Sequence, residues 1–146
     1  MIPLKDHHPS TRFPVVNYLL LAANILVFFA TWSLSARELE DFYRQYALIP
    51  ARFITGQGFT ALFTSMFLHG SLFHLLGNML FLHIFGDNLE DVLGRVKYLF
   101  YYLAAGLGAI ALQVAINPSS TISMLGASGA IAGVMGGYLL LFPNHR

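Results

Sequence analysis

Cysteine is absent from this chain and charge is scarce. Among its 146 residues there are eight Lys and Arg and seven Asp and Glu, which together make up 10%. The absence of cysteine excludes disulfide bonds, thiolate metal sites and a cysteine nucleophile. A soluble domain of this length needs a charged shell of about a quarter of its residues. The composition therefore excludes an ordinary water-soluble enzyme, and its apolar content excludes a disordered chain.

The net charge of +1 and the lack of a basic run also speak against nucleic acid as a partner. What the chain has in abundance is apolar side chains, which make up 56% of the residues and are gathered into long blocks. Such blocks are typical of membrane proteins with several spans. We therefore predict an all-α bundle of transmembrane helices over residues 15–146, preceded by a polar cytoplasmic segment, residues 1–14.

The first apolar block, Val15 to Leu34, contains no charge. As a helix its 20 residues would reach about 30 Å, which is the thickness of the hydrocarbon core. No signal cleavage site follows, so we predict a retained first span in which Asn17 and Asn24 face neighbouring helices. The connection after it, Ser35 to Thr60, is long, and its apolar second half indicates a partly immersed interfacial segment.

The second and third spans are predicted from helix-start and helix-stop signals. Gly70 and Ser71 form a start signal, so the second helix is expected to begin near Ser71 and to end by Gly94. Ala61 to Leu68 is then left in the loop that leads into this helix. The third span is predicted over Tyr98 to Ile116, and a proline-containing turn ends it.

A fourth apolar stretch runs from Ile122 to Phe142, and glycines recur in it at every fourth residue, at Gly129, Gly133 and Gly137. One face of this helix is therefore bare backbone and permits close approach by another helix. If the helix begins at Ser128, its rise of about 22 Å is shorter than the bilayer core. The backbone before it must then dip below the outer surface and line a water-filled hollow.

Polar side chains inside a bilayer are candidates for function, and three of them are expected at one depth. His74 and Asn78 are four residues apart and share a helix face. Ser128 stands at a helix N-terminus, where free N–H groups favour a developing negative charge. Ser128 can supply the hydroxyl for acyl transfer, and its own N–H, the Asn78 amide and the His74 ring can supply donors for the oxyanion. Gly126 and Gly129 leave room for a peptide substrate.

These motifs resemble the rhomboid family of intramembrane serine proteases. His74-x-x-x-Asn78 is similar to the oxyanion pair of that family, and Gly126-x-Ser128-Gly129 is similar to its nucleophile motif. The resemblance implies a rhomboid fold, with Ser128 as the nucleophile and His74 and Asn78 as the residues that stabilise the oxyanion. It also implies that no metal or organic cofactor is needed.

The resemblance covers about Pro50 to Pro143, the first four of six core helices, so four of the six core spans are expected here. The family's helix-capping acidic residue corresponds to Glu90, whereas its Trp-Arg pair in the first loop is not seen and only Arg52 stands in that region. The family's catalytic base is a histidine on the sixth helix, and this chain stops at Arg146. We therefore expect an N-terminal portion, truncated after the fourth span, that is inactive as printed and whose base lies beyond residue 146.

The implied activity of the full-length protein is cleavage of single-span membrane proteins near or within their transmembrane segment. An alternative is a non-catalytic rhomboid-like protein that binds transmembrane helices. A small transporter or channel subunit is a third interpretation, but the spans contain no charged groups that could line a pore. A metal site is not expected, because His74 and His83 lie on opposite helical faces and no carboxylate joins them.

Each candidate also has a simpler structural interpretation. Ser128 could be a small packing residue, and His74 and Asn78 could be hydrogen-bonding side chains between helices. His69 is interpreted as a loop-packing or rim histidine, and His83 as a core or cytoplasmic-side histidine. The three polar groups at one depth favour the catalytic interpretation.

The distribution of Lys and Arg favours a cytoplasmic N-terminus by five residues to three. The inner residues would be Lys5, Arg12, Arg95, Lys97 and Arg146, and the outer ones Arg37, Arg44 and Arg52. The acidic cluster at the end of the second span is interpreted as a solvated inner turn; it consists of Asp87, Glu90 and Asp91. The expected location is the plasma membrane of a prokaryote.

Overall fold

The computed structural model describes residues 13–143, and the fold is helical as predicted. The four long helices are α1 (Val15–Thr31), α5 (Leu72–Leu93), α6 (Arg95–Ile116) and α7 (Ser128–Leu141). Between α1 and α5 lie α2 (Ala36–Tyr46), α3 (Pro50–Phe53), α4 (Ala61–Thr64) and the 3₁₀ turn η1 (Ser65–Phe67). Within the described residues the only β-type pairing is an isolated bridge between Leu48 and Met124.

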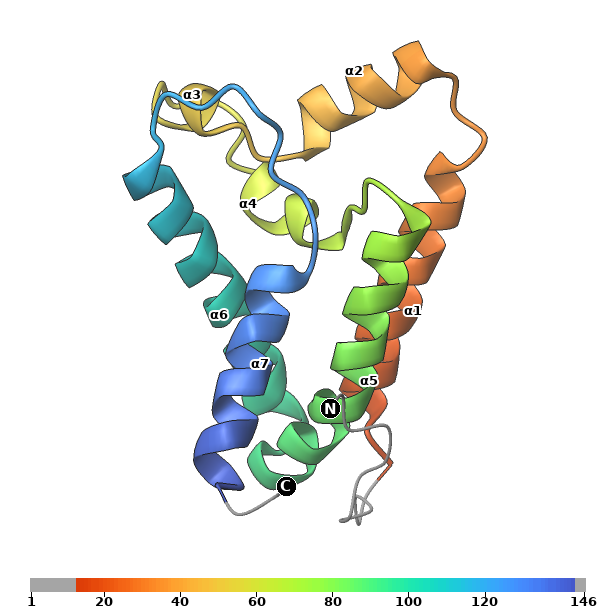
Figure 1. Cartoon of the computed structure of the whole chain (residues 1–146), viewed down its shortest axis with the longest axis vertical. Coiled ribbons are helices and arrows are strands. Elements are labelled where there is room, and N and C mark those ends of the chain that lie inside the picture. The colour runs from red at the N-terminus through yellow and green to blue at the C-terminus, as the bar shows by residue number, and fades with distance from the viewer. Residues whose placement is uncertain (1–12, 144–146) are drawn as a thin grey trace.

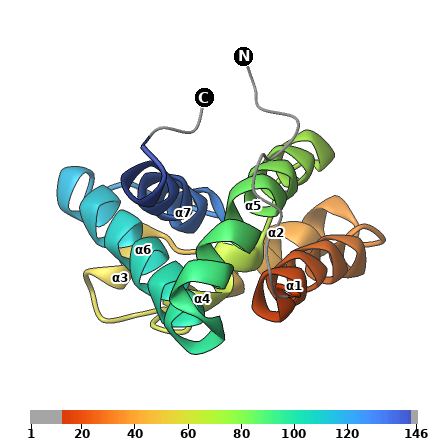
Figure 2. The ribbon, with the colours of Figure 1, turned by 90° about the horizontal axis from the view of Figure 1, so that it is seen from below.

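The long helices form two pairs, α1 with α5 and α6 with α7, and the pairs meet where α5 contacts α7. α1 packs beside α5, α7 packs beside α6, and α5 and α7 also contact each other (Figures 1 and 2). The short helices α2, α3 and α4 lie at the end where α5 begins and α6 ends (Figure 1). α7 begins at Ser128, well below the end of α6 (Figure 1). The loop over residues 117–127 therefore descends into the bundle, as expected if the helix begins at Ser128.

By length and composition, α6 is the one described helix that could cross a membrane by itself. α5 meets the same criterion only together with the α4–η1 turn, from which it is bent by 93°. α1 and α7 are apolar but shorter, at 17 and 14 residues. The all-helical fold is as predicted, while the number of spans stays a prediction.

The segment Ala61 to Leu68 is not a plain loop, so that prediction was wrong. It forms α4 and η1, and it does so because its side chains on one side are buried: Ala61, Ser65 and Met66 are at most 3% exposed. The start of α5 was predicted correctly. Ser71 caps it by accepting a hydrogen bond from the backbone N–H of His74 at 3.2 Å.

The polar connection after α1 contains an amphipathic helix, α2, that the sequence interpretation missed. Ser35 caps it in a capping box, because its hydroxyl accepts a hydrogen bond from the Glu38 N–H while the Glu38 carboxylate accepts one from the Ser35 N–H. α2 has no fully buried residue and carries the ion pair of Arg44 with Glu40, 2.7 Å apart, on its exposed face.

The glycines of α7 pack against α6 as predicted. A Cβ on Gly129 would lie 2.6 Å from the Cβ of Ala109, and one on Gly137 would lie 2.8 Å from the Tyr101 hydroxyl. The same hydroxyl donates a 2.7 Å hydrogen bond to the carbonyl of Gly133. The bare face of α7 therefore brings the two backbones together and fixes the height of Ser128 relative to α6.

The end of the bundle where α1 begins and α5 ends is held by Glu90, which is only 3% exposed. Its carboxylate accepts hydrogen bonds from the backbone N–H groups of Val16, at 3.1 Å, and Asn17, at 2.7 Å. The first N–H groups of α1 need such an acceptor, because Pro14 precedes them and no side chain of α1 caps them. The interpretation of Glu90 as part of a solvated turn was therefore wrong, and the capping role that the resemblance implied is confirmed.

Asn17 and Asn24 are both fully buried, as expected for polar residues that face the bundle. Asn17 joins three helices: its amide donates to the Leu82 carbonyl at 3.2 Å, and its side-chain oxygen accepts from the Tyr98 hydroxyl at 2.8 Å. Asn24 donates to the Leu20 carbonyl of its own helix at 2.7 Å. Together with Glu90, Asn17 ties α1, α5 and α6 into one unit at this end.

Replacing Glu90 with alanine is expected to lower the free energy of unfolding by about 2 kcal/mol or more, because two buried N–H groups lose their acceptor. The effect is to be measured as thermal unfolding in detergent micelles. Glu40→Ala is the control, since Glu40 pairs only on the exposed surface and its loss should change little. Equal melting temperatures for the two variants would contradict the capping role.

Candidate functional site

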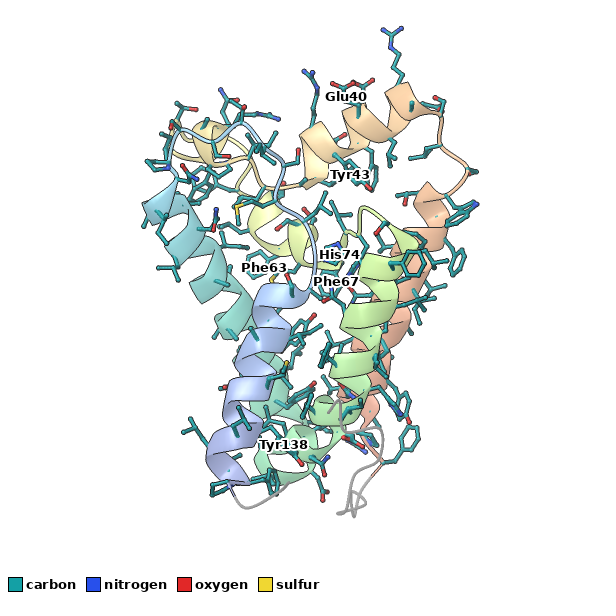
Figure 3. The ribbon with its side chains drawn as sticks, viewed as in Figure 1. Glu40, Tyr43, Phe63, Phe67, His74 and Tyr138 are labelled. Carbon is teal, nitrogen blue, oxygen red and sulfur yellow. The ribbon has the colours of Figure 1, made fainter. Side chains whose placement is uncertain are left out.

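His74 and Asn78 lie one above the other on the same face of α5, in its first two turns. His74 is half-buried and Asn78 is 8% exposed. Their position follows from the Ser71 cap, which sets where the helix begins. In Figure 3 His74 lies at the upper end of α5, on the side of the loop that leads into α7.

This loop, residues 117–127, is tied by backbone hydrogen bonds to segments far earlier in the chain. The N–H of Ala51 donates to the Ser120 carbonyl at 3.0 Å. Leu48 and Met124 exchange two hydrogen bonds of 3.1 and 2.7 Å. The N–H of Gly126 donates to the Ser65 carbonyl at 2.9 Å. These bonds hold the loop in place just before α7 begins.

Gly126 joins the loop to the two polar side chains of α5. Its φ is +121°, a conformation that favours glycine. A Cβ at this position would lie 2.7 Å from Cε1 and 2.9 Å from Nε2 of His74, and 3.7 Å from Nδ2 of Asn78. The backbone two residues before Ser128 is therefore in direct contact with the His74 ring and near the Asn78 amide.

Ser128 is the first residue of α7, and its side chain is exposed. No side chain caps this helix, so its first N–H groups are available to a ligand. Ser128 lines a hollow of about 410 Å³ that lies between the loop and α6, with Ser65, Gln113 and Gly126 among its other walls. Among the described residues no hydrogen bond joins Ser128 to His74 or Asn78. Gly126 lies between them, because it is two residues before Ser128 in the chain and lies beside both His74 and Asn78.

His69 is the residue of this region that the sequence interpretation undervalued. Its ring is 2% exposed, its Nε2 lies 2.9 Å from Nδ2 of Asn78, and its centroid lies 5.0 Å from that of His74. His69 is a loop histidine that packs against its surroundings, as expected, and the residues it contacts are Asn78 and His74 of the candidate site. The bend of 93° between the α4–η1 turn and α5 places His69 beside the first two turns of α5.

Tyr43 connects α2 to the same loop. Its hydroxyl donates a hydrogen bond of 3.1 Å to the backbone carbonyl of His69 (Figure 3 shows Tyr43 on the underside of α2). Burial raises the pKa of Tyr43 above its ordinary value, so the hydroxyl remains a donor at neutral pH. The amphipathic helix α2 is thereby fastened above the candidate site.

Comparison with known proteins identifies the family. Residues 56–146 match the Rhomboid domain, and this segment contains α5, α6 and α7 with all the residues of the candidate site. The chain belongs to the rhomboid family. The resemblance seen in the sequence motifs is thus confirmed at the level of the family.

Several named rhomboid proteins are similar to this chain. YdcA of Bacillus subtilis, described as a candidate rhomboid protease, is 34% identical over 91% of this chain and 66% of its own length. Rhomboid protein 1, mitochondrial, of Saccharomyces cerevisiae is 31% identical over 88% of this chain and 37% of its own. The human presenilin-associated rhomboid-like protein, mitochondrial, is 29% identical over 87% and 33%. The chain thus spans about one third to two thirds of the length of these rhomboids.

Among the described residues, His83 is the remaining histidine of this rhomboid chain. His83 is exposed on α5, where its ring lies 6.2 Å from that of Tyr18, so it is not a core histidine, while the alternative of a cytoplasmic-side histidine stays a prediction. His7, His8 and His145 lie outside the described residues. In residues 13–143 no three His, Cys, Asp or Glu side chains are grouped as metal ligands would be.

Arg52, the residue that stood in the region of the Trp-Arg pair implied by the resemblance, forms a contact within the first loop itself. Its guanidinium donates a hydrogen bond to the backbone carbonyl of Arg44. This contact closes the turn between α2 and α3. Arg52 therefore supports the segment that pairs with the loop before Ser128, through Leu48 and Met124.

Proposed function

We propose that the full-length protein is an intramembrane serine endopeptidase that cleaves membrane proteins near or within their transmembrane segment. Ser128 is the nucleophile, His74 and Asn78 stabilise the oxyanion, and a histidine beyond residue 146 is the base. The observation that carries the proposal is the contact of Gly126, two residues before Ser128, with the ring of His74 and its proximity to the amide of Asn78.

In the proposed reaction the Ser128 Oγ attacks the scissile carbonyl carbon, and the base takes the hydroxyl proton. The tetrahedral oxyanion accepts hydrogen bonds from the Ser128 N–H, the Asn78 amide and the His74 ring. The C–N bond then breaks, the base gives its proton to the leaving amine, and an acyl ester on Ser128 remains. Water hydrolyses this ester by the same steps and regenerates the hydroxyl.

The proposed substrates are single-span membrane proteins that reach the site from the bilayer. Large apolar side chains on the outer faces of the helices, such as Phe73, Phe100 and Leu140, are exposed and suit contact with lipid. We propose a plasma-membrane location with the N-terminus in the cytoplasm. The bacterial relative YdcA supports this location, whereas the yeast and human relatives are named as mitochondrial.

A fluorophosphonate probe tests the proposal, because it forms a stable adduct only with an activated serine. The full-length protein in detergent is treated with the probe and digested, and the modified peptide is sequenced by mass spectrometry. We expect one adduct, on Ser128. An adduct on another serine would contradict the nucleophile, and a folded protein without any adduct would favour the non-catalytic alternative, the binding of transmembrane helices.

Replacing Asn78 with alanine is expected to lower kcat by about 100-fold, which is typical for the loss of one oxyanion donor. KM should change little, because the interaction forms in the transition state. Cleavage of a reconstituted single-span substrate is the measurement, and Asn117→Ala, in the exposed loop after α6, is the matched control. An unchanged rate would make Asn78 a packing residue only.

A further inference from the structure

We propose that His69 is a positioning residue that fixes the orientation of the Asn78 side-chain amide and thereby turns its N–H₂ group toward the loop before Ser128. The inference rests on the proposed function, since it assigns Asn78 the role of an oxyanion donor. It adds a residue that lies outside both sequence motifs. In the described structure His69 forms no hydrogen bond with Ser128 or with the loop over residues 117–127.

The geometry starts from one short contact. Nε2 of His69 lies 2.9 Å from Nδ2 of Asn78, and both groups are buried, with exposed fractions of 2% and 8%. An amide nitrogen can only donate, so the ring nitrogen that faces it must accept and must be unprotonated. One of the two amide hydrogens is then used by His69, and the other is directed elsewhere.

The second hydrogen of the Asn78 amide lies on the side of the loop over residues 117–127. The Cβ position of Gly126 lies 3.7 Å from the same Nδ2, so the amide nitrogen is the part of Asn78 nearest to the backbone that leads into Ser128. An oxyanion bound beside this backbone would meet an N–H group. The reversed amide would present its oxygen instead, which repels a developing negative charge.

His69 therefore decides between two orientations of nearly equal shape. The two ends of an asparagine amide occupy almost the same volume, so packing alone does not distinguish them. A neutral imidazole with its proton on Nδ1 offers only an acceptor at Nε2, and it stabilises the orientation with the N–H₂ group toward the ring. A ring with its proton on Nε2 would stabilise the reversed orientation.

Two contacts hold His69 in this place, and burial keeps its ring neutral. The His74 ring packs edge-on against it, with centroids 5.0 Å apart. The Tyr43 hydroxyl fixes its backbone carbonyl from α2. Burial disfavours a charged imidazole, and no carboxylate of the described chain hydrogen-bonds to it, so the ring stays neutral. Nδ1 of His69 is buried and has no hydrogen-bond partner among the described residues, so the contact with Asn78 is what sets the proton position of this neutral ring.

The kinetic test compares two replacements of His69 in the full-length protein. His69→Phe keeps a ring of similar size but removes the acceptor, and it should lower kcat about 10-fold with little change in KM. His69→Gln retains a side-chain oxygen that can accept from the Asn78 amide, and it should keep kcat within about 3-fold of the original. A purely structural role predicts that the phenylalanine variant is as active as the glutamine variant, or that both lose activity with their melting temperatures.

A spectroscopic test on the unmodified protein does not depend on how the variants fold. With ¹⁵N-labelled histidine, the imidazole nitrogens of His69 should report a neutral ring with its proton on Nδ1. A proton on Nε2, or a charged ring at pH 7, would overturn the proposal. This measurement does not depend on catalysis. If the protein formed no fluorophosphonate adduct, the protease proposal would fail, but the measured tautomer of the His69 ring would still test its contact with Asn78.

Discussion

Turnover of a transmembrane substrate by the full-length protein is expected to fall by about 10⁴-fold or more when Ser128 is replaced by alanine. The acyl transfer proposed here has no path without this hydroxyl, and what remains is the residual rate from substrate binding and the oxyanion donors. The replacement removes a single oxygen from an exposed side chain in the first turn of α7. Alanine is also a good helix former, so folding should be unaffected.

The measurement is cleavage of a single-span substrate in proteoliposomes, followed by gel analysis, with thermal unfolding of each variant in detergent. Ser119→Ala is the matched control, since Ser119 is an exposed serine of the loop that leads into α7. It should retain the original rate. A Ser128→Ala protein that cleaves at more than about 1% of the original rate would show that another group is the nucleophile.

Both ends of α5 could be predicted from the sequence because their signals are local. Ser71 caps α5 through its own hydroxyl, and Gly94 adopts a φ of +77° in the one-residue link between α5 and α6. A start of α7 at Ser128 was considered only as a condition within the apolar stretch from Ile122 to Phe142, and the structure shows that the helix does begin there. The close packing of α7 on α6 could also be predicted, because three glycines at every fourth residue share one face.

What the sequence did not yield are contacts between distant segments. Glu90 looks like a surface residue in its own neighbourhood, and only the arrival of α1, more than 70 residues away in the sequence, buries it. α4 and η1 formed where a loop was expected, because the burial that stabilises them comes from the rest of the bundle. α2 was not predicted because its many charged residues resemble those of a solvated connection, although Ser35 and Glu38 form a recognisable capping box.

The candidate site divides in the same way. His74 and Asn78 could be paired from their spacing, because two residues four apart on a helix face one direction. His69 lies in a turn, where spacing predicts no direction, so its contact with Asn78 depended on the sharp bend before α5. The family supplied the roles of the motif residues, while the structure supplied the contact between Gly126 and α5.

Replacing Gly126 with alanine is expected to lower turnover by about 10³-fold or more, and also to destabilise the protein. The backbone φ of +121° is strained for any residue with a Cβ, which costs about 1–3 kcal/mol. The new Cβ would lie 2.7 Å from Cε1 of His74, so the ring or the loop must move. Either movement separates the proposed donors from Ser128, and a misplacement of about 1 Å can cost 100-fold in rate.

Gly136→Ala is the matched control, because Gly136 lies on α7, has no positive φ, and would receive a Cβ without contact within 4 Å. It should keep both rate and melting temperature. A Gly126→Ala protein with the original activity would show that the spacing between the loop and α5 does not matter for the reaction, and it would remove the observation on which the proposed function rests.

A double replacement separates the two consequences of the Gly126 change. Removing the imidazole with His74→Ala creates space for the new Cβ, so Gly126→Ala with His74→Ala should melt at a higher temperature than Gly126→Ala alone. Turnover should not recover, because a proposed oxyanion donor is then missing. Recovery of both quantities would show that His74 is only an obstacle to the Cβ. Recovery of neither would place the damage in the strained backbone at Gly126.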